Sequence, residues 1–170
     1  LILASSFYAV RRKDLNDDEE AATLYNDTVY MPSFSSLPLL EWTEMRPGGD
    51  TICSRGTPYA FFVRRGVPGA PVILEFEGGG ACWSKSTCIK ATGTFKDTVE
   101  NSRAGLARIM TGEQRSQGLS NDNGPYHNYT LIYVPYCTGD LHWGNNSVAY
   151  TDSLFIRHNG AANAYSAYSY

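Results

Sequence analysis

The sequence predicts one α/β domain, and two features support this prediction. Two short apolar runs, residues 72–76 and 130–134, pass directly into loops, which is typical of strands buried inside a sheet. Between them, residues 94–110 predict an amphipathic helix, because four apolar side chains recur at helical spacing: Phe95, Val99, Leu106 and Met110. Strands that alternate with helices indicate a largely parallel sheet with helices on its faces.

Two further elements are predicted beside this core. Residues 59–63 are rich in aromatic side chains and predict a strand, and residues 65–69 predict the turn that closes it. Near the other end, Asn159 precedes the alanine-rich residues 161–168, for which we predict a helix. We expect binding or catalytic residues in the loops at the carboxyl ends of the strands.

The first forty residues differ from the rest in composition. Residues 1–10 are mostly apolar and are followed at once by three basic residues, which is typical of the end of a signal peptide or of a signal anchor. An acidic stretch and a stretch rich in proline and serine come next, as in solvated linkers. We therefore expect residues 1–40 to be a leader remnant and a linker, and residues 41–170 to belong to the folded domain.

Composition argues against several kinds of partner. The 170 residues include 14 Lys and Arg and 17 Asp and Glu, for a net charge of −3. Without a basic excess, nucleic acid is not expected as a partner. No run reaches ~18 apolar residues, so no complete membrane span is predicted, and a membrane contact is expected only through an N-terminal anchor. The oligomeric state is not predicted.

Cysteines and glycosylation sequons favour the secretory pathway or the cell wall. The four cysteines, Cys53, Cys82, Cys88 and Cys137, lack metal-site spacing, and with only three histidines we expect no metal and no cofactor. Three Asn-x-Ser/Thr sequons begin at Asn26, Asn128 and Asn145. An even cysteine count, three sequons and an apolar leader together predict secretion. Free buried thiols in a reducing cytosol remain the alternative.

A glycine-rich loop follows the strand at residues 72–76. In the sequence Glu77-Gly78-Gly79-Gly80-Ala81-Cys82-Trp83, three glycines expose backbone N–H groups that can stabilise negative charge on an oxygen. Neither a phosphate loop nor a dinucleotide fingerprint is present. We expect Gly79 and Gly80 to lie at the end of a central strand, beside residues 135–144, with amides that no backbone group pairs. A plain tight turn is the alternative.

The loop at residues 135–144 holds Asp140, His142 and Trp143. An acid beside an imidazole can perform general acid–base catalysis, although residues this close in a loop usually make local hydrogen bonds. Trp83 and Trp143 can line a carbohydrate or acyl pocket, or serve as half-buried packing. Trp83, Asp140 and Trp143 are therefore the candidate substrate contacts.

Three cysteine-containing motifs together resemble the pectin acetylesterase/Notum family. Cys53 with Gly56 is similar to the opening segment of that family, residues 74–83 with Cys88 to its glycine loop, and residues 134–144 to its Pro-Tyr-Cys loop. The resemblance implies an α/β-hydrolase-like sheet and a serine carboxylesterase that removes acyl groups, acetyl above all, from a polysaccharide such as pectin or from another ester. It implies Gly79 and Gly80 as backbone donors of the oxyanion hole.

The nucleophile of that family is missing from this sequence. No Gly-x-Ser-x-Gly elbow occurs, and the resemblance places the elbow and the Ser–Asp–His triad beyond Tyr170. We therefore expect an incomplete sheet, truncated before the elbow, with an unpaired edge at residues 130–134 and no activity in this chain alone. A non-catalytic secreted carbohydrate-binding or interaction domain is the alternative.

Four cysteines allow three pairings. We predict Cys82–Cys88, which lie in one loop region, and Cys53–Cys137, which lie near the ends of separate segments.

Overall fold

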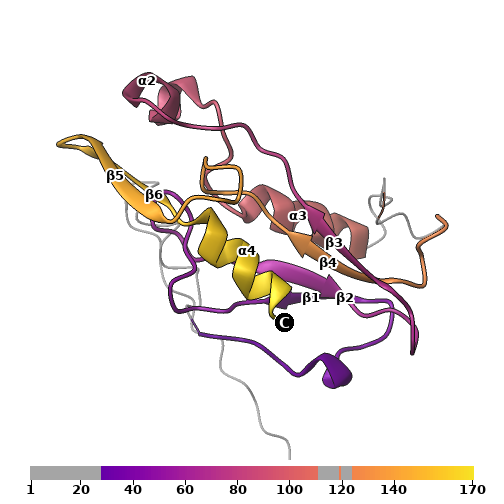
Figure 1. The fold of residues 1–170 in the computed structure, drawn as a ribbon. Helices are drawn as coiled ribbons and strands as arrows, with labels where there is room; N and C mark the ends of the chain where they lie inside the picture. The colour runs from indigo at the N-terminus through magenta and orange to yellow at the C-terminus, as the bar shows by residue number, and fades with distance from the viewer. Residues whose placement is uncertain (1–27, 111–118, 120–123) are drawn as a thin grey trace, which may run out of the picture.

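The structure, a computed structural model, describes residues 28–110, 119 and 124–170 (Figure 1). The expected leader and Asn26 lie outside these residues. The elements follow in chain order: η1 (Phe34–Ser36), β1 (Trp42–Met45), β2 (Phe61–Arg64), β3 (Val72–Phe76), α2 (Lys85–Cys88), η2 (Lys90–Thr92), α3 (Glu100–Met110), β4 (Thr130–Val134), β5 (Asn146–Thr151), β6 (Leu154–His158) and α4 (Gly160–Tyr168).

The main sheet has four strands in the order β1-β2-β4-β3. Only β3 and β4 are parallel, with Val72 opposite Thr130 and Phe76 opposite Val134, whereas β2 is antiparallel to both β1 and β4. The sheet is therefore mixed rather than largely parallel. The connection after β3 brings β4 between β2 and β3, which leaves β3 at the edge of the described sheet.

This strand order corrects two expectations. The glycine loop follows an edge strand and not a central one. The unpaired edge does not lie at Thr130–Val134 either, because β4 pairs with β2 on one side and with β3 on the other. Sequence patterns indicate which residues form strands, but the neighbours of a strand depend on how its connections cross the sheet.

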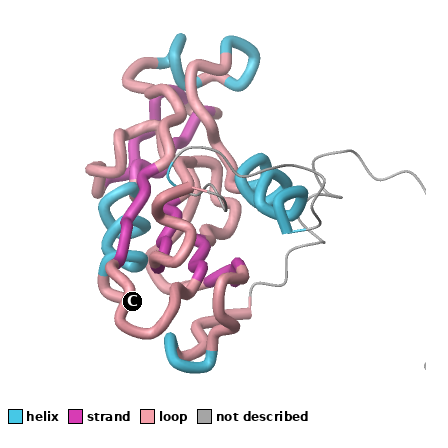
Figure 2. Tube along the Cα trace, turned by 90° about the vertical axis from the view of Figure 1, so that its right-hand side faces the viewer, coloured by secondary structure: helices cyan, strands magenta, loops and turns pink. Residues whose placement is uncertain are grey.

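Helices α3 and α4 cover opposite faces of this sheet (Figure 2). On the α4 side, Phe61, Val63 and Val134 pack in one apolar cluster with Ala167. On the α3 side, Phe62 and Leu131 pack with Leu106. Successive strand residues point to opposite faces, so one short strand such as β2 can serve both clusters, and all four of its residues are buried.

The buried strand β2 ends in a charged residue. Arg64 is buried in this strand, and its Nη2 donates a hydrogen bond to the carbonyl oxygen of His127 at 2.9 Å. Its guanidinium also lies over the Trp42 ring, 5.9 Å from the ring centroid. A buried cation requires such partners, which explains how the α3 face of the sheet tolerates an arginine.

The predicted elements occur in the structure, two strands with the predicted bounds and the others with shifted bounds. The strands at 72–76 and 130–134 have the predicted bounds, while the strand predicted at 59–63 is β2 at Phe61–Arg64 and the last helix begins one residue early, at Gly160. The helix predicted from residue 94 begins at Glu100, because the preceding residues are extended against the glycine loop, where Phe95 bridges Gly80. Strand β1 and the β5–β6 hairpin were not predicted.

None of the described helices is long and apolar enough to cross a membrane. Within residues 28–110 and 124–170, no three His, Cys, Asp or Glu side chains gather closely enough to hold a metal ion.

Candidate active site

Two disulfides join the segments around the candidate site. Cys53 pairs with Cys137 and Cys82 pairs with Cys88, with Cα–Cα distances of 5.1 and 4.9 Å. These are the two predicted pairs. The first bond fixes the loop after β4 to the segment before β2, and the second closes the turn that follows the glycine loop.

The glycine loop packs too closely for larger residues. At Gly79 a Cβ atom would collide with the Tyr136 ring, and at Gly80, where φ is +81°, it would collide with the Thr94 carbonyl. The Gly79 carbonyl accepts a hydrogen bond from the Lys96 N–H at 2.8 Å. The amides of Gly79 and Gly80 donate to no other residue in the described part of the chain. Such amides can receive an oxyanion.

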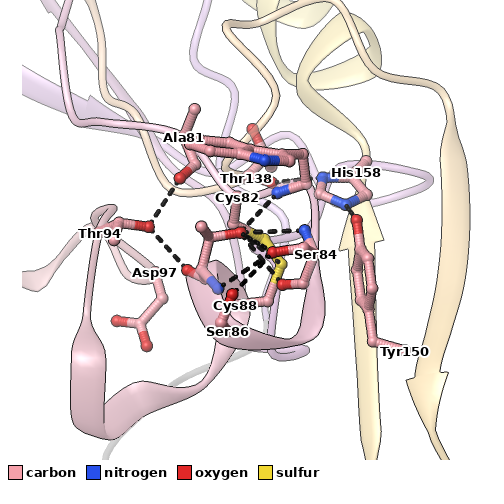
Figure 3. Close-up of a disulfide and its surroundings, with 12 residues drawn as sticks. Ala81, Cys82, Ser84, Ser86, Cys88, Thr94, Asp97, Thr138, Tyr150 and His158 are labelled. Atoms are coloured by element: carbon pink, nitrogen blue, oxygen red, sulfur yellow. Dashed lines mark hydrogen bonds between the residues drawn. A yellow bond between two sulfur atoms is a disulfide. The ribbon is translucent and has the colours of Figure 1, made fainter.

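The turn closed by Cys82 and Cys88 is a network of local hydrogen bonds (Figure 3). The Ser84 hydroxyl caps α2 by accepting from the Thr87 N–H, and the Thr87 hydroxyl accepts from the Ser84 N–H at 3.0 Å. The Thr94 hydroxyl lies 2.8 Å from the Ala81 carbonyl oxygen and 2.7 Å from that of Thr87. Ser84 is thus engaged in a helix cap.

Glu77 connects the glycine loop to three other segments. One carboxylate oxygen lies 2.6 Å from Lys96 Nζ. The other accepts hydrogen bonds from the Ser102 hydroxyl of α3 at 2.8 Å and from the Tyr136 N–H at 3.0 Å. The Glu77 carbonyl accepts from Nε2 of His142 at 2.9 Å. Only 11% of the Glu77 side chain is exposed, so these contacts are largely shielded from water.

These contacts shift the pKa values of neighbouring groups. Burial alone would raise the pKa of Glu77, but hydrogen bonds outweigh burial and hold this pKa below the ordinary value, with donors Lys96, Tyr136 N–H, Tyr133 and Ser102. Burial first, and then the charge of Glu77, raise the pKa values of Tyr133 and Glu75. Oε2 of Glu75 is buried without a hydrogen-bond partner among the described residues.

Asp140 joins the second loop to α4. Its Oδ1 accepts hydrogen bonds from the Thr138 hydroxyl at 2.6 Å and the His142 backbone N–H at 3.1 Å, and its Oδ2 accepts from the Gly160 N–H at 2.7 Å. The two candidate loops meet where the Cys82 N–H donates to the Gly139 carbonyl at 2.9 Å. Both oxygens of Asp140 are thus engaged within the chain.

The His142 ring bonds to Glu77, whereas His142 bonds to the Asp140 carboxylate through its backbone N–H. The imidazole lies between the rings of Phe76 and Tyr136, with centroid distances of 5.1 and 4.9 Å, and its Nε2 donates to the Glu77 carbonyl. Leu141 and His142 both have positive φ values, of 58° and 65°, which non-glycine residues adopt at a cost. Asp140 and His142 therefore make hydrogen bonds within the loop and to neighbouring segments, as in the alternative to acid–base catalysis given above.

The two tryptophans of the candidate loops are exposed, and Trp143 lines an apolar groove. The exposed fractions are 69% for Trp83 and 86% for Trp143. An apolar groove of about 600 Å³ lies between the end of β3, the second loop and α4, and it is lined by Phe76, Leu141, His142, Trp143, Ala161, Ala164, Tyr165 and Tyr168.

Comparison with known proteins decides the family. The sequence model described as pectinacetylesterase matches residues 42–165. The chain belongs to the pectinacetylesterase family. The match covers β1 to α4 and includes both candidate loops.

Curated relatives of this pectinacetylesterase-family chain are carboxylesterases or an inactive form of one. Over 111 residues, the chain is 25% identical to palmitoleoyl-protein carboxylesterase notum1a of Danio rerio, covering 62% of this chain and 22% of the relative. Over 161 residues it is 23% identical to palmitoleoyl-protein carboxylesterase NOTUM of Mus musculus, and this match covers 91% of this chain and 27% of the relative. The chain thus spans about a quarter of the length of these two relatives.

A third relative differs in length. The inactive palmitoleoyl-protein carboxylesterase notum1b of Danio rerio is 29% identical over 111 residues, which cover 65% of this chain and 76% of the relative.

Glu77, Lys96 and Tyr136 were not predicted as site residues. Glu77 carried a weak signal, because an acidic residue directly after a short apolar run needs a partner if it is buried, although that run, β3, proves to be a partly exposed edge strand rather than the buried one expected. Its partners come from separate segments of the chain, so no local pattern reveals them.

Proposed function

We propose that residues 41–170 are the N-terminal part of a secreted serine carboxylesterase with an α/β-hydrolase-like sheet. The observation that carries this proposal is the glycine loop, in which the Gly79 and Gly80 amides have no acceptor in the described chain. Two amides fixed beside the end of a strand suit the oxyanion of an ester-hydrolysis intermediate. In this proposal they stabilise the charge that develops on the ester carbonyl oxygen.

The nucleophile is proposed to come from sequence outside this chain. Among the described residues, the three histidines bond to backbone carbonyls or, for His158, also to the Tyr150 hydroxyl, and none bonds to a serine. Strand β3 has one unpaired side in the described sheet, beside the glycine loop. A further strand on that side would deliver a serine next to Gly79 and Gly80, which supports a triad supplied by the rest of the protein.

The proposed substrate is an acylated polysaccharide such as pectin, from which the acetyl group is removed as acetate and the sugar hydroxyl is freed. The family description supports an acetyl ester, whereas the notum1a and mouse NOTUM relatives are palmitoleoyl-protein carboxylesterases. In this proposal Trp83 and Trp143 stack on sugar rings, since both are exposed beside the glycine loop or the groove. The disulfides and the exposed sequon at Asn145 support secretion.

The decisive experiment uses the gene product that carries residues 1–170 together with its downstream sequence. We expect hydrolysis of p-nitrophenyl acetate and release of acetate from acetylated pectin, both lost when the elbow serine is replaced by alanine. The 170-residue chain alone should give background rates, because its described residues hold no paired nucleophile and base. Hydrolysis of long-chain palmitate esters but not of acetylated pectin would overturn the polysaccharide assignment.

The inactive Danio rerio relative, of which the match covers 76%, favours a second candidate function, that of a non-catalytic carbohydrate-binding domain. In that case the 170-residue chain itself should bind acetylated pectin. Replacement of Trp143 by Ala should weaken the binding about tenfold, because a stacked aromatic ring typically contributes ~1–3 kcal/mol. Leu119→Ala, also at an exposed apolar residue, is the matched control.

A further inference from the structure

Glu77 binds residues from three other segments around the candidate site. Its carboxylate binds Lys96 and Ser102, and it also accepts from the Tyr136 N–H. Its carbonyl holds the His142 ring. All these partners donate hydrogen bonds to Glu77 in the structure, so the site suits an ionised carboxylate.

Two of these partners touch the glycine loop directly. The Tyr136 ring lies where a Cβ at Gly79 would be, so the position of Tyr136 limits where Gly79 can lie. The backbone N–H of Lys96 donates to the Gly79 carbonyl, while its side chain reaches Glu77. The peptide units of the loop are therefore fixed between two residues that Glu77 holds in place.

We propose that Glu77 is the positioning residue of the glycine loop, holding Tyr136 and Lys96 so that the Gly79 and Gly80 amides keep the orientation an oxyanion needs. This inference rests on the proposed function, because the loop is an oxyanion hole only in an esterase. Glu77 itself contacts no substrate in this scheme and acts through its neighbours. Preorganised donors are effective because they need no rearrangement during the reaction.

The substitution Glu77→Gln removes the negative charge of the side chain and nearly keeps its shape. The glutamine has nearly the same volume but keeps only one acceptor oxygen, and its amide nitrogen donates. It therefore cannot serve Lys96 on one side and Ser102 with Tyr136 on the other. The matched control is Glu44→Gln, because Glu44 binds Arg103 through both oxygens at 2.7 and 2.9 Å but lies on β1, at the opposite edge of the sheet from β3.

The first measurement is amide hydrogen exchange in the gene product that carries this chain. We expect exchange in residues 77–83 and 135–144 to become at least tenfold faster in Glu77→Gln and to stay within twofold in Glu44→Gln. Lys96→Met tests the same contact from its exposed side, where 38% of the Lys96 side chain is accessible, and should loosen the same two segments at least threefold. Exchange within twofold of the wild type in both segments would overturn the proposal.

The second measurement is ester hydrolysis per mole of enzyme that reacts with a fluorophosphonate, which counts folded sites only. We expect kcat to fall at least tenfold in Glu77→Gln with KM within twofold, because the oxyanion forms after substrate binds. An unchanged kcat in an enzyme with a loosened loop would also overturn the proposal. If the wild-type product has no esterase activity, the proposed function fails, and the exchange comparison alone still decides whether Glu77 orders the loop.

Discussion

The Asp140 carboxylate accepts a hydrogen bond from the Gly160 N–H, at the first residue of α4, across 20 residues of sequence. Asn159, at the N-cap position, makes no side-chain capping bond, so Asp140 supplies the negative group from outside the helix. The loop after β4 and the N-terminus of α4 are thereby held together, because an anion at a helix N-terminus is favourable.

Replacing Asp140 by Ala should lower the free energy of unfolding by about 2–3 kcal/mol, since the amides of Gly160 and His142 and the Thr138 hydroxyl lose a charged acceptor. Asp140→Asn should cost about half as much. Urea unfolding monitored by circular dichroism measures both. The exposed Asp152→Asn should stay within ~0.5 kcal/mol, and an equal loss there would contradict the capping role.

Alanine substitutions at two glycines with positive φ distinguish the cost of backbone strain from the cost of a steric collision. Gly69 has a φ of +79° and open space around it, whereas Gly80 has a φ of +81° and the Thr94 carbonyl against it. Gly69→Ala should cost about 1 kcal/mol of unfolding free energy and Gly80→Ala about 2–4 kcal/mol, because crowding adds to strain. Chemical denaturation of the two variants tests the difference, and equal costs would show that the loop moves aside freely.

The two disulfides should contribute unequally to stability. Cys53–Cys137 spans 84 residues and Cys82–Cys88 spans 6, so the loop-closure entropy removed from the unfolded chain differs. We expect a loss of about 4–5 kcal/mol for Cys53→Ser with Cys137→Ser and about 2 kcal/mol for the other pair. Guanidinium unfolding of each double variant measures the losses. A larger loss for the short loop would indicate that native packing dominates over chain entropy.

Stability should fall at acid pH in a manner that depends on Glu77. Its pKa is lowered in the folded chain, so its contribution is complete above the ordinary pKa of 4.5 and is lost as pH falls through the folded-state pKa. The raised pKa of the neighbouring Glu75, caused first by burial, acts in the opposite direction, so the comparison with Glu77→Gln isolates the part that Glu77 contributes. Thermal melts between pH 6 and pH 3 should show a steeper decline for the wild type than for Glu77→Gln.

Secretion predicts glycan attachment at exposed sequons. Asn145 is exposed and precedes β5, whereas Asn128 is half buried and its carbonyl binds the Val67 N–H. Expression in a eukaryotic secretory host should give a mobility shift that peptide N-glycosidase removes and that Asn145→Gln reduces. A product with neither shift nor glycan mass would contradict secretion through that pathway.

Local patterns predicted strands where a short apolar run is bounded by loops, which is why the bounds of β3 and β4 agree with the sequence. They did not predict the β5–β6 hairpin, whose first strand begins with the exposed polar residues Asn146 and Ser147 and lacks a clear alternation. The neighbours of β3 depend on a long connection and not on the composition of the strand itself.

The sequence predicted the two loops of the candidate site but not the residues that hold these loops in place. Three consecutive glycines after a strand are a local signal, so Gly79 and Gly80 were identifiable. The contacts of Glu77 join Lys96, Ser102 and Tyr136, which lie up to 59 residues away in sequence. Interactions of that range leave no local pattern. The role of Asp140 at α4 escaped prediction for the same reason.

The late arrival of β4 has a consequence for biosynthesis. Strand β3 pairs only with β4 in the described sheet, and β2 also needs β4 on its inner side, so neither strand can complete its pairing until residue 134 has been made. At ~5–20 residues per second, the ribosome needs about 3–12 s to travel from Phe76 to Val134. During that interval Val72–Phe76 is an apolar, unpaired segment on a nascent chain, and that segment is where chaperone binding during translation is expected.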